Sequence, residues 1–392
     1  MSILDHIREF HAELTEWRRD FHAHPELGFE EIRTSGLVAE RLAAFGCEVH
    51  RGLGQTGVVG TLRTGNGART IGLRADMDAL PMHEANEFAH RSRHDGRMHG
   101  CGHDGHTTML LGAARYLAET RNFDGTVHFI FQPAEEGLGG ADAMIRDGLF
   151  QQFPCDVIFG MHNRPGLPVG EYAIRPGPMM AGGAFFDITV RGRGGHGARP
   201  ESGIDPVLTA CHIATALQSI VARNVAPMDT AVLSVTQIDG GSAYNVIPSE
   251  AALRGTARAF RTETMQLIES NMRRIAEGVA AGFGATADVD FRFLFQPVVN
   301  DEVETGFIAD TAALLVGETK VERNRSPVMG SEDFASMLSI VPGAYIHVGN
   351  GVGAGGCEVH NPAYDFNDAA LPYGAGLLAG LVERKLARLD LE

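Results

Sequence analysis

The residues best suited to chemistry lie in the segment RMHGCGHDGHTTML (97–110), directly ahead of an apolar helical pattern. Within eight residues this segment carries three imidazoles, a thiol and a carboxylate: His99, Cys101, His103, Asp104 and His106. Such a polar cluster is costly to bury unless something pairs with it, and a divalent cation pairs with all of these donors. A thiolate at Cys101 would form readily beside metal charge. The segment therefore favours a metal site over a solvated, histidine-rich turn.

Two adjacent carboxylates stand in a second segment, FQPAEEGLGGA (131–141), at the end of an apolar run. Glu135 and Glu136 would repel each other there unless a cation or a proton separates them. One carboxylate can bind the metal while the other serves as a general base. Taken in isolation, an ordinary acidic turn is an equally good interpretation.

Two further histidines occupy similar places, His162 in DVIFGMHNRP and His360 in GCEVHNPAYDFND. A single histidine at a strand end is more often structural than a ligand. Together with Cys101 and the glutamates, however, ligands arriving from four strand-end loops are typical of a two-metal hydrolytic site. Asp78 in RADMDALP (74–81) is a candidate for orienting a metal-bound imidazole, although it could equally cap a turn.

Composition excludes several other classes of function. The 392 residues include 49 acidic and 33 basic side chains, a net charge of −16, and no basic cluster that would favour nucleic acid. Only two basic residues are lysines, Lys320 and Lys385, and neither follows a glycine or sits in apolar surroundings, which argues against phosphate-loop and Schiff-base chemistry. No stretch approaches the roughly 18 apolar residues of a membrane span, and the N-terminus lacks a signal-peptide pattern. We therefore expect a cytoplasmic protein that binds no membrane.

The elements that must position these residues alternate between strands and helices. Apolar runs at 57–63, 70–77, 126–133 and 156–162 predict strands, and helical patterns fall near 104–120 and 140–147, after two helices in the first 45 residues. This alternation of strands and helices indicates an α/β domain whose central mixed sheet is flanked by helices. Beyond residue 297 the α/β pattern resumes, with helices near 303–316, 331–340 and 367–388 and a strand at 344–349.

A different order of elements interrupts this pattern. Strands at 185–192, 230–238, 249–260 and 287–295 and helices at 205–223 and 262–283 follow the order β-α-β-β-α-β, which is typical of a ferredoxin-like α+β domain. The sequence thus predicts a discontinuous catalytic domain, 1–183 plus 296–392, with an inserted domain at 184–295.

Seven segments, in this order, resemble the dinuclear metal-dependent amidohydrolases and peptidases. This family includes hippurate hydrolases, N-acyl-amino-acid amidohydrolases and indole-acetyl-amino-acid hydrolases, relatives of aminoacylase and the glutamate carboxypeptidases. The resemblance runs over nearly the whole chain. The segments are HGCGHDGH (99–106), FQPAEEG (131–137), GMHN (160–163), GRGGHGARP (192–200), NVIP (245–248), GSEDF (330–334) and HNPAYDFND (360–368).

The resemblance implies two divalent metal ions per subunit, with Glu135 as general base and Asp78 beside the ligands. The implied ligands are Cys101 as the bridge, His103, Glu136, His162 and His360. In the wider family the bridge is usually Asp and an early ligand is His, where this chain has Cys101 and Asp76. That departure, which the hippurate-hydrolase branch shares, weakens any transfer of metal preference or peptide specificity from the aminoacylases. Because members of this branch are often manganese enzymes, the resemblance favours Mn²⁺ and leaves Zn²⁺, Co²⁺ and Ni²⁺ open.

The inserted domain resembles the family's lid and dimerisation domain, which implies a homodimer or a higher homo-oligomer formed through the lid. By the same resemblance, His196 would polarise the scissile carbonyl, from its own or a partner subunit's lid, and Asn245 would contact the substrate's carboxylate. From the residues alone, a flexible glycine turn and a capped bend before Pro248 are the better interpretations.

The function implied is hydrolysis of the amide bond of small N-acyl amino acids, such as hippurate-like conjugates, to a carboxylic acid and a free amino acid. Metal binding lowers the pKa of a water, and Glu135 would remove the proton. A metallo-dipeptidase or carboxypeptidase with the same site is the alternative. A non-catalytic binding module is a remote third hypothesis, since such a module would be expected to have lost ligands and none is missing.

Overall fold

The computed structural model of the protein describes residues 1–388, which divide into two compact units. The first comprises Met1–Gly177, Val299–Ser326 and the chain from Asp333 onward, and the second comprises Pro178–Val298 with Pro327–Glu332. The segments 178–183, 296–298 and 327–332, which the sequence pattern places in the first domain, therefore group with the second. Among residues 1–388, no helix combines the length and the apolar character that crossing a membrane requires.

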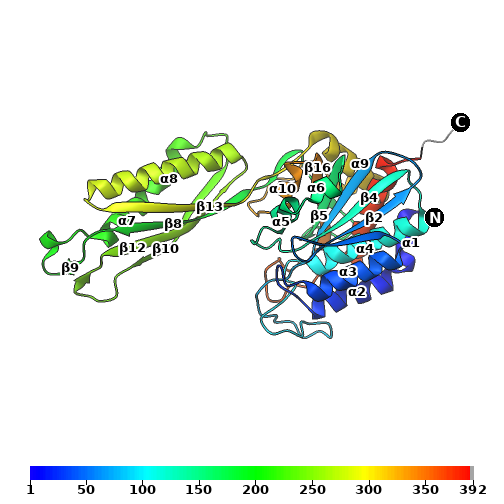
Figure 1. Ribbon diagram of the computed structural model, residues 1–392, viewed down its shortest axis with the longest axis horizontal. Helices are drawn as coiled ribbons and strands as arrows, with labels where there is room; N and C mark the ends of the chain where they lie inside the picture. The colour runs from blue at the N-terminus through cyan, green and yellow to red at the C-terminus, as the bar shows by residue number, and fades with distance from the viewer. Residues whose placement is uncertain (389–392) are drawn as a thin grey trace. The chain divides into compact units, whose positions relative to one another are not determined.

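The first unit is built on an eight-stranded mixed sheet in the order β1-β2-β4-β3-β5-β16-β6-β15 (Figure 1). Strands β3, β4, β5 and β16 pair in parallel, whereas β1 and β2 join in antiparallel fashion. β4 and β16 are buried along their full length, as expected for strands covered on both faces. The strands are β1 Glu48–Leu53, β2 Gly57–Thr64, β3 Thr70–Asp76, β4 Gly125–Gln132, β5 Val157–Pro165, β6 Tyr172–Ala173, β15 Val321–Glu322 and β16 Gly343–Gly351.

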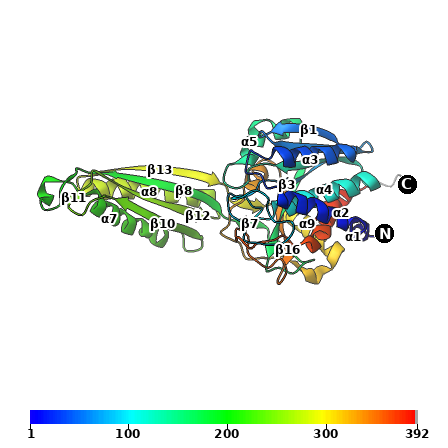
Figure 2. The ribbon, with the colours of Figure 1, turned by 90° about the horizontal axis from the view of Figure 1, so that it is seen from below.

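Helices pack around this sheet, with α4 and α11 against β3, and α3 against β1 and β2 (Figures 1 and 2). The helices are α1 Ile3–Glu9, α2 His11–Ala23, α3 Ile32–Ala44, α4 His103–Thr120, α5 Gly140–Arg146, α6 Leu149–Gln152, α9 Glu302–Val316, α10 Phe334–Leu338 and α11 Leu371–Lys385, with short 3-10 turns at Glu318–Lys320 and Asp368–Ala370. The mixed sheet flanked by helices confirms the predicted fold class.

Three local predictions differ from the structure. The first 45 residues form three helices rather than two, because Phe10 leaves helical geometry (φ −114°, ψ 20°) and its N–H bonds back to Ile7 O at 3.2 Å. Strand β1 was not expected, since its exposed, polar positions lack an apolar run. The helix expected at 331–340 spans only Phe334–Leu338.

The second unit is the expected β-α-β-β-α-β domain, an antiparallel sheet in the order β10-β12-β8-β13. Its elements are β8 Gly182–Arg191, α7 Pro206–Ser219, a π-helical turn Ile220–Asn224, β10 Ala231–Gly240, β12 Glu250–Ala259, α8 Thr262–Gly282 and β13 Thr286–Phe295. Alternate residues of β8, such as Phe186 and Ile188, are buried and pack in one core with Ile213 of α7 and Ile268 of α8. Also present are a ribbon of β9 Gly195–His196 and β11 Val246–Ile247, a 3-10 turn Pro200–Ser202, and, where the chain passes between units, β7 Gly177–Met180 and β14 Val298–Asn300.

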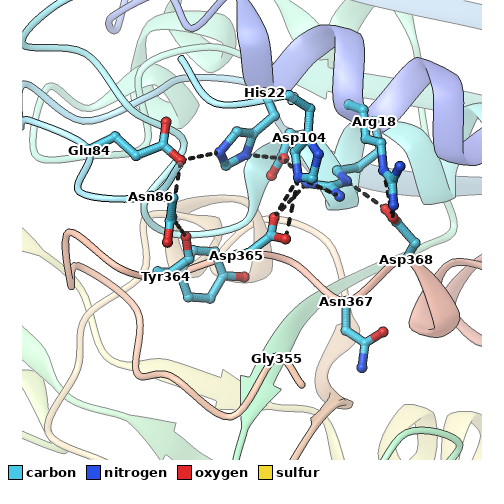
Figure 3. A network of polar contacts seen from close by, with 12 residues as sticks. Arg18, His22, Glu84, Asn86, Asp104, Gly355, Tyr364, Asp365, Asn367 and Asp368 are labelled. Carbon is cyan, nitrogen blue, oxygen red and sulfur yellow. Dashed lines mark hydrogen bonds and ion pairs between the residues drawn. The ribbon is translucent and has the colours of Figure 1, made fainter. Parts of the chain in front are cut away.

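A buried charge network ties α2 to the first turn of α4 (Figure 3). His22 Nδ1 donates to Asp104 Oδ2 at 2.8 Å, and its Nε2 lies 3.2 Å from Glu84 Oε1. Arg18 bonds to Asp365 at 2.8 Å and Asp368 at 2.7 Å, so the C-terminal segment joins the same network. Burial opposes charge on His22, but the Asp104 carboxylate outweighs it and raises the pKa of His22 to about 9. The network therefore holds α4 in place through a charged imidazole.

Close packing at the start of α4 generates a prediction for Gly105. A Cβ at this position would lie 2.3 Å from Cε2 of Phe366. Because overpacking a core typically costs about 1–3 kcal/mol, Gly105→Ala should lower the free energy of unfolding by that amount, measured by urea denaturation with Trp17 fluorescence. In Gly36→Ala, on α3, the added Cβ meets nothing closer than 4.0 Å, so this control should gain up to about 1 kcal/mol. Equal stability of the two variants would contradict the packing.

The raised pKa of His22 predicts how stability depends on pH. A group whose folded pKa lies above its unfolded value of 6.5 stabilises the fold fully below that value, and this contribution is lost as pH rises through about 9. The shift corresponds to on the order of 3 kcal/mol. We expect His22→Gln to be less stable than the wild type by about this amount at pH 6 and by much less at pH 10, in urea titrations of the metal-free protein.

The control for this titration is His83→Gln, which makes the same substitution at an imidazole whose side chain is 78% exposed. Its free energy of unfolding should stay near that of the wild type. A stability gap for His22→Gln that is the same at pH 6 and pH 10 would show that His22 does not act through its charge.

Candidate metal centre

The candidate site lies where the parallel strands β3, β4 and β5 end. Asp76 is the last residue of β3, Glu135 and Glu136 follow β4, and His162 lies in the second half of β5. Carboxyl ends of parallel strands meet at one edge of the sheet, where α/β proteins place their ligands. α4 begins at His103, next to β3, so its first turn is brought to the same region.

Four overlapping groups of donor atoms in the first unit converge at this edge. Within each group the ligand atoms lie within 4.8 Å of one another. The groups are Cys101 with His103 and His162, Cys101 with Glu136 and His360, His103 with Glu135 and Glu136, and Asp76 with His103 and His106. The structure thus brings the five residues predicted as ligands together with Glu135. Cys101 and Glu136 each belong to two of these groups, and His103 belongs to three.

His162 is oriented by the backbone beside it. Its Nδ1 donates to the carbonyl oxygen of Asn163 at 2.7 Å, which leaves Nε2 as the bare nitrogen, 3.3 Å from Cys101 Sγ. Burial, aided by the neighbouring His106, lowers the pKa of His162 well below its usual value, so the ring is neutral. A neutral imidazole with its lone pair on Nε2 is the form that binds a metal.

Asp78 holds two of the segments that carry donors. Its Oδ1 accepts the backbone N–H of Glu135 and its Oδ2 accepts that of Glu136, both at 3.0 Å. Oδ1 also lies 3.3 Å from Nδ1 of His103. Since Nδ1 of His103 faces Asp78, the Nε2 atom is the one available to a ligand, and it is buried without a hydrogen-bond partner.

Backbone strain marks both sides of the site. Ala134, just before the glutamates, has φ 53°, and His360 has φ 62°, values that non-glycine residues rarely adopt. Each is held by a hydrogen bond: the N–H of Ala134 donates to Glu31 Oε1 at 2.9 Å, and the N–H of His360 donates to Gly100 O at 2.7 Å. The surrounding structure therefore imposes these conformations, and with them the directions of the side chains.

The charges at the site suit divalent cations. Burial, together with the carboxylates of Glu136, Glu135 and Asp76, raises the pKa of the Cys101 thiol well above its usual value. A thiolate here needs more positive charge beside it, and a divalent cation supplies that charge. Nε2 of His103 is buried without a hydrogen-bond partner, and Oε1 of Glu136 lies 3.2 Å from Nε2 of His360. Thiolate, imidazole and carboxylate are ligands of Zn²⁺-like and Mn²⁺-like ions, so the donor set fits two such ions.

Not every residue of the segment 97–110 reaches this donor set. His103 and His106 are three residues apart on α4 and share a face, whereas Asp104 turns toward α2 and pairs with His22. His99 falls in no donor group of the described residues, and burial lowers its pKa to about 4, so it stays neutral. The prediction of metal-paired donors throughout the segment therefore fails for His99 and Asp104.

The two residues expected to contact substrate lie in the second unit. His196 is on β9, opposite Val246 of β11, and the N–H of Gly197 donates to Asn245 O at 2.8 Å. His196 and Asn245 are both exposed, and the ribbon brings them close together. Their chemistry is therefore available to a ligand at this end of the second unit.

Sequence reasoning missed several buried polar residues around the donors. Asn163, Tyr364 and Glu31 received no role, although Asn163 directly follows His162 and Tyr364 lies in the segment that contains His360. The positions of Asn163 and Tyr364 within the motifs were the available signal, whereas Glu31 lies outside every motif. All three are buried.

Comparisons with known proteins agree with this geometry. Residues 72–384 match the model described as Peptidase family M20/M25/M40. The chain is 42% identical over 386 residues to the hippurate hydrolase of Campylobacter jejuni subsp. jejuni, covering 98% of this chain and 100% of that one. It is 39% identical over 376 residues to the N-acetylcysteine deacetylase of Bacillus subtilis, covering 95% and 97%.

A solved structure from Bacillus subtilis, described as a dinuclear metal binding peptidase from the M20 family, superimposes with a TM-score of 0.85. It is 35% identical and the match covers 97% of this chain and 99% of that chain. These matches confirm the family, the fold and the enzyme class that the sequence motifs predicted. The chain belongs to peptidase family M20/M25/M40 and is a metal-binding amidohydrolase.

Proposed function

We propose that the protein hydrolyses the amide bond of N-acyl amino acids, releasing a carboxylic acid and a free amino acid. The observation that carries this proposal is the buried Glu135, which lies in one donor group with His103 and Glu136. The relatives named above as hippurate hydrolase and N-acetylcysteine deacetylase support the acyl-amino-acid class of substrate. Hippurate-like conjugates are our first choice within it.

We propose that two divalent ions would be held by the predicted ligands, with Cys101 as the bridge. Cys101 is the one residue common to the group with His103 and His162 and the group with Glu136 and His360. The remaining ligands are His103, Glu136, His162 and His360. When bound, such ions polarise a carbonyl oxygen and lower the pKa of a water molecule. Mn²⁺ is our proposal for the native ion, and Zn²⁺, Co²⁺ and Ni²⁺ are the competitors to test.

Glu135 is placed to move the proton. Its carboxylate takes a proton from the attacking water and returns it to the leaving nitrogen, a role for which a carboxylate must be held near the reacting atoms. Asp78 fixes the backbone of Glu135 through its N–H. The catalytic contribution of Asp78 is thus to aim both Glu135 and His103.

We also propose that the domain at 184–295 acts as a lid and joins subunits into a homodimer or a higher homo-oligomer. His196 stabilises the oxygen of the scissile carbonyl, and Asn245 contacts the carboxylate of the amino acid. Their exposure side by side on the β9 and β11 ribbon supports these roles. We place the enzyme in the cytoplasm.

Replacing the general base tests the mechanism. Glu135→Gln keeps the size of the side chain but cannot accept a proton, so we expect metal content to stay at two ions while kcat falls by roughly 10²–10⁴-fold. The readouts are metal analysis and release of glycine from N-benzoylglycine. Glu40→Gln, at an exposed position of α3, is the matched control. A Glu135→Gln enzyme with the wild-type rate would refute the assignment.

A substrate panel tests the reaction class. After removal of metal with a chelator, the protein is reloaded separately with Mn²⁺, Zn²⁺, Co²⁺ or Ni²⁺ and given acetyl, benzoyl and indole-acetyl amino acids alongside dipeptides. We expect no turnover without metal, the highest rate with Mn²⁺, and cleavage of one acyl class ahead of the dipeptides. Faster cleavage of dipeptides would assign a peptidase instead, and two bound ions with no turnover on any substrate would reject the proposed reaction.

A further inference from the structure

A chain of buried polar side chains lies behind the candidate ligands and belongs to none of their predicted roles. It runs from β3 across α4 and β5 to the C-terminal segment. Each member is at most 1% exposed. The members are Arg74, Asp76, His106, Asn163 and Tyr364. Polar groups buried this completely are stable only when each is paired, so their arrangement specifies one geometry.

The hydrogen bonds of His106 show that its Nδ1 carries a proton. Asp76 forms an ion pair with Arg74 at 2.7 Å, and a carboxylate can only accept hydrogen bonds. Asp76 Oδ1 lies 2.6 Å from Nδ1 of His106, so Nδ1 is the donor. Nε2 lies 3.0 Å from the backbone nitrogen of Asn163, whose N–H points to it, and 2.8 Å from the side-chain Oδ1 of the same residue, so both ring nitrogens are engaged within this chain. His106 therefore links the end of β3 to the backbone of β5.

The contact between His106 and Asn163 also affects the ligand His162. Asn163 is fixed at its N–H by His106, and its carbonyl accepts the proton on Nδ1 of His162 at 2.7 Å. That second bond is the one that turns Nε2 of His162 toward Cys101. His106 thus sets the orientation of His162 through Asn163.

The side chain of Asn163 reaches a second ligand segment. Its Nδ2 donates to the hydroxyl of Tyr364 at 2.6 Å, and Tyr364 lies four residues after His360. The backbone of Tyr364 is held in turn by Asn86, whose Nδ2 donates to Tyr364 O at 2.9 Å (Figure 3). Asn163 thereby connects β5 with the segment that carries His360.

The segment that carries Cys101 and His103 passes close to the same pair. A Cβ at Gly102, where φ is 95°, would lie 2.4 Å from Asn163 Oδ1 and 2.6 Å from the Tyr364 hydroxyl oxygen. Only glycine permits this approach. Three ligand-bearing segments therefore meet at Asn163, and His106 is the side chain that bonds to its backbone N–H.

We propose that His106 is a positioning residue that sets the orientation of His162 and of the His360 segment through Asn163, without binding metal itself; this assignment rests on the proposed function. Residues that orient metal ligands in this way typically change metal affinity or activity by about 10–100-fold when mutated. The same effect is expected of His106, whereas a merely space-filling role would leave the metal environment unchanged.

Two substitutions separate the two sides of the imidazole. The amide of Gln reaches the level of Nε2 and can still accept from the N–H of Asn163, whereas the shorter Asn reaches the level of Nδ1 and can bond only to Asp76. With Co²⁺ as the probe, His106→Asn should bind about 10–100-fold more weakly and show altered visible and near-ultraviolet absorption at saturating Co²⁺. His106→Gln should restore affinity and spectrum toward the wild type.

The matched control is His128→Gln, which removes a buried imidazole of β4 that bonds to Thr61 and lies in no donor group of the described residues. Its cobalt spectrum should equal that of the wild type. Near-ultraviolet circular dichroism shows whether each variant is folded. If His106→Asn does not fold, Tyr364→Phe carries the test, because it removes only the hydroxyl that accepts from Asn163 and should weaken cobalt binding in the same direction by a smaller factor.

Several outcomes would overturn the proposal. A folded His106→Asn or Tyr364→Phe protein with the wild-type affinity and spectrum would show that the chain does not position the ligands. Loss of one equivalent of Co²⁺ at saturation in His106→Asn would make His106 a ligand instead. Failure of the wild-type protein to bind two Co²⁺ ions is a separate result, which would overturn the proposed metal centre and this inference with it.

Discussion

Everything around the site depends on holding a thiol and several carboxylates together at one buried edge of a sheet. Burial and the carboxylates of Glu136, Glu135 and Asp76 raise the electrostatic cost of charging the Cys101 thiol, as its raised pKa shows. The protein offsets part of this charge: Arg74 pairs with Asp76, and His103 lies between Asp76 and Asp78, whose carboxylates overcome burial and raise its pKa to about 10. The remainder is the charge that divalent cations would supply. Metal binding and the geometry of the site are therefore coupled, because the same donors repel one another until cations join them.

Two separate polar networks hold α4 in the position that this constraint requires. On one side, Asp104 pairs with His22 and Arg18, which anchors the first turn of the helix to α2 and to the C-terminal segment. On the other side, His106 pairs with Asp76 and Asn163. His103 lies between them on the same turn. A helix held from two sides cannot rotate without breaking buried hydrogen bonds, so the direction of His103 is fixed before any ligand arrives. The side chain of His360, in contrast, is 53% exposed, which leaves it open to solvent.

The sequence predicted the elements with strong local signals and missed those that depend on distant contacts. The buried strands β3, β4 and β5 and the start of α4 followed from apolar runs and from the cluster at 99–106. The helix break at Phe10 has no proline or glycine to announce it. The relation between Asn163 and Tyr364 spans 201 positions, and spacing alone cannot reveal such a pair. Local spacing also gave a wrong prediction inside the cluster at 99–106. The helical turn that begins at His103 directs Asp104 away from His103 and His106. His99 precedes the helix and lies outside the donor groups of the described residues.

The positions at which this chain departs from the wider family are related through the same contacts. An aspartate stands at 76 where the wider family has a histidine ligand, and a cysteine stands at 101 where it has a bridging aspartate. In this structure Asp76 is directed to Arg74 and His106, and its nearer oxygen lies 3.9 Å from Nε2 of His103. Asp76 thus brings a negative charge beside the donors, where it shares one group with His103 and His106. There it orders His106 and, through Asn163, the ring of His162. A neutral side chain at 76 would remove the buried carboxylate that both Arg74 and His106 contact, so the order of this part of the site depends on Asp76.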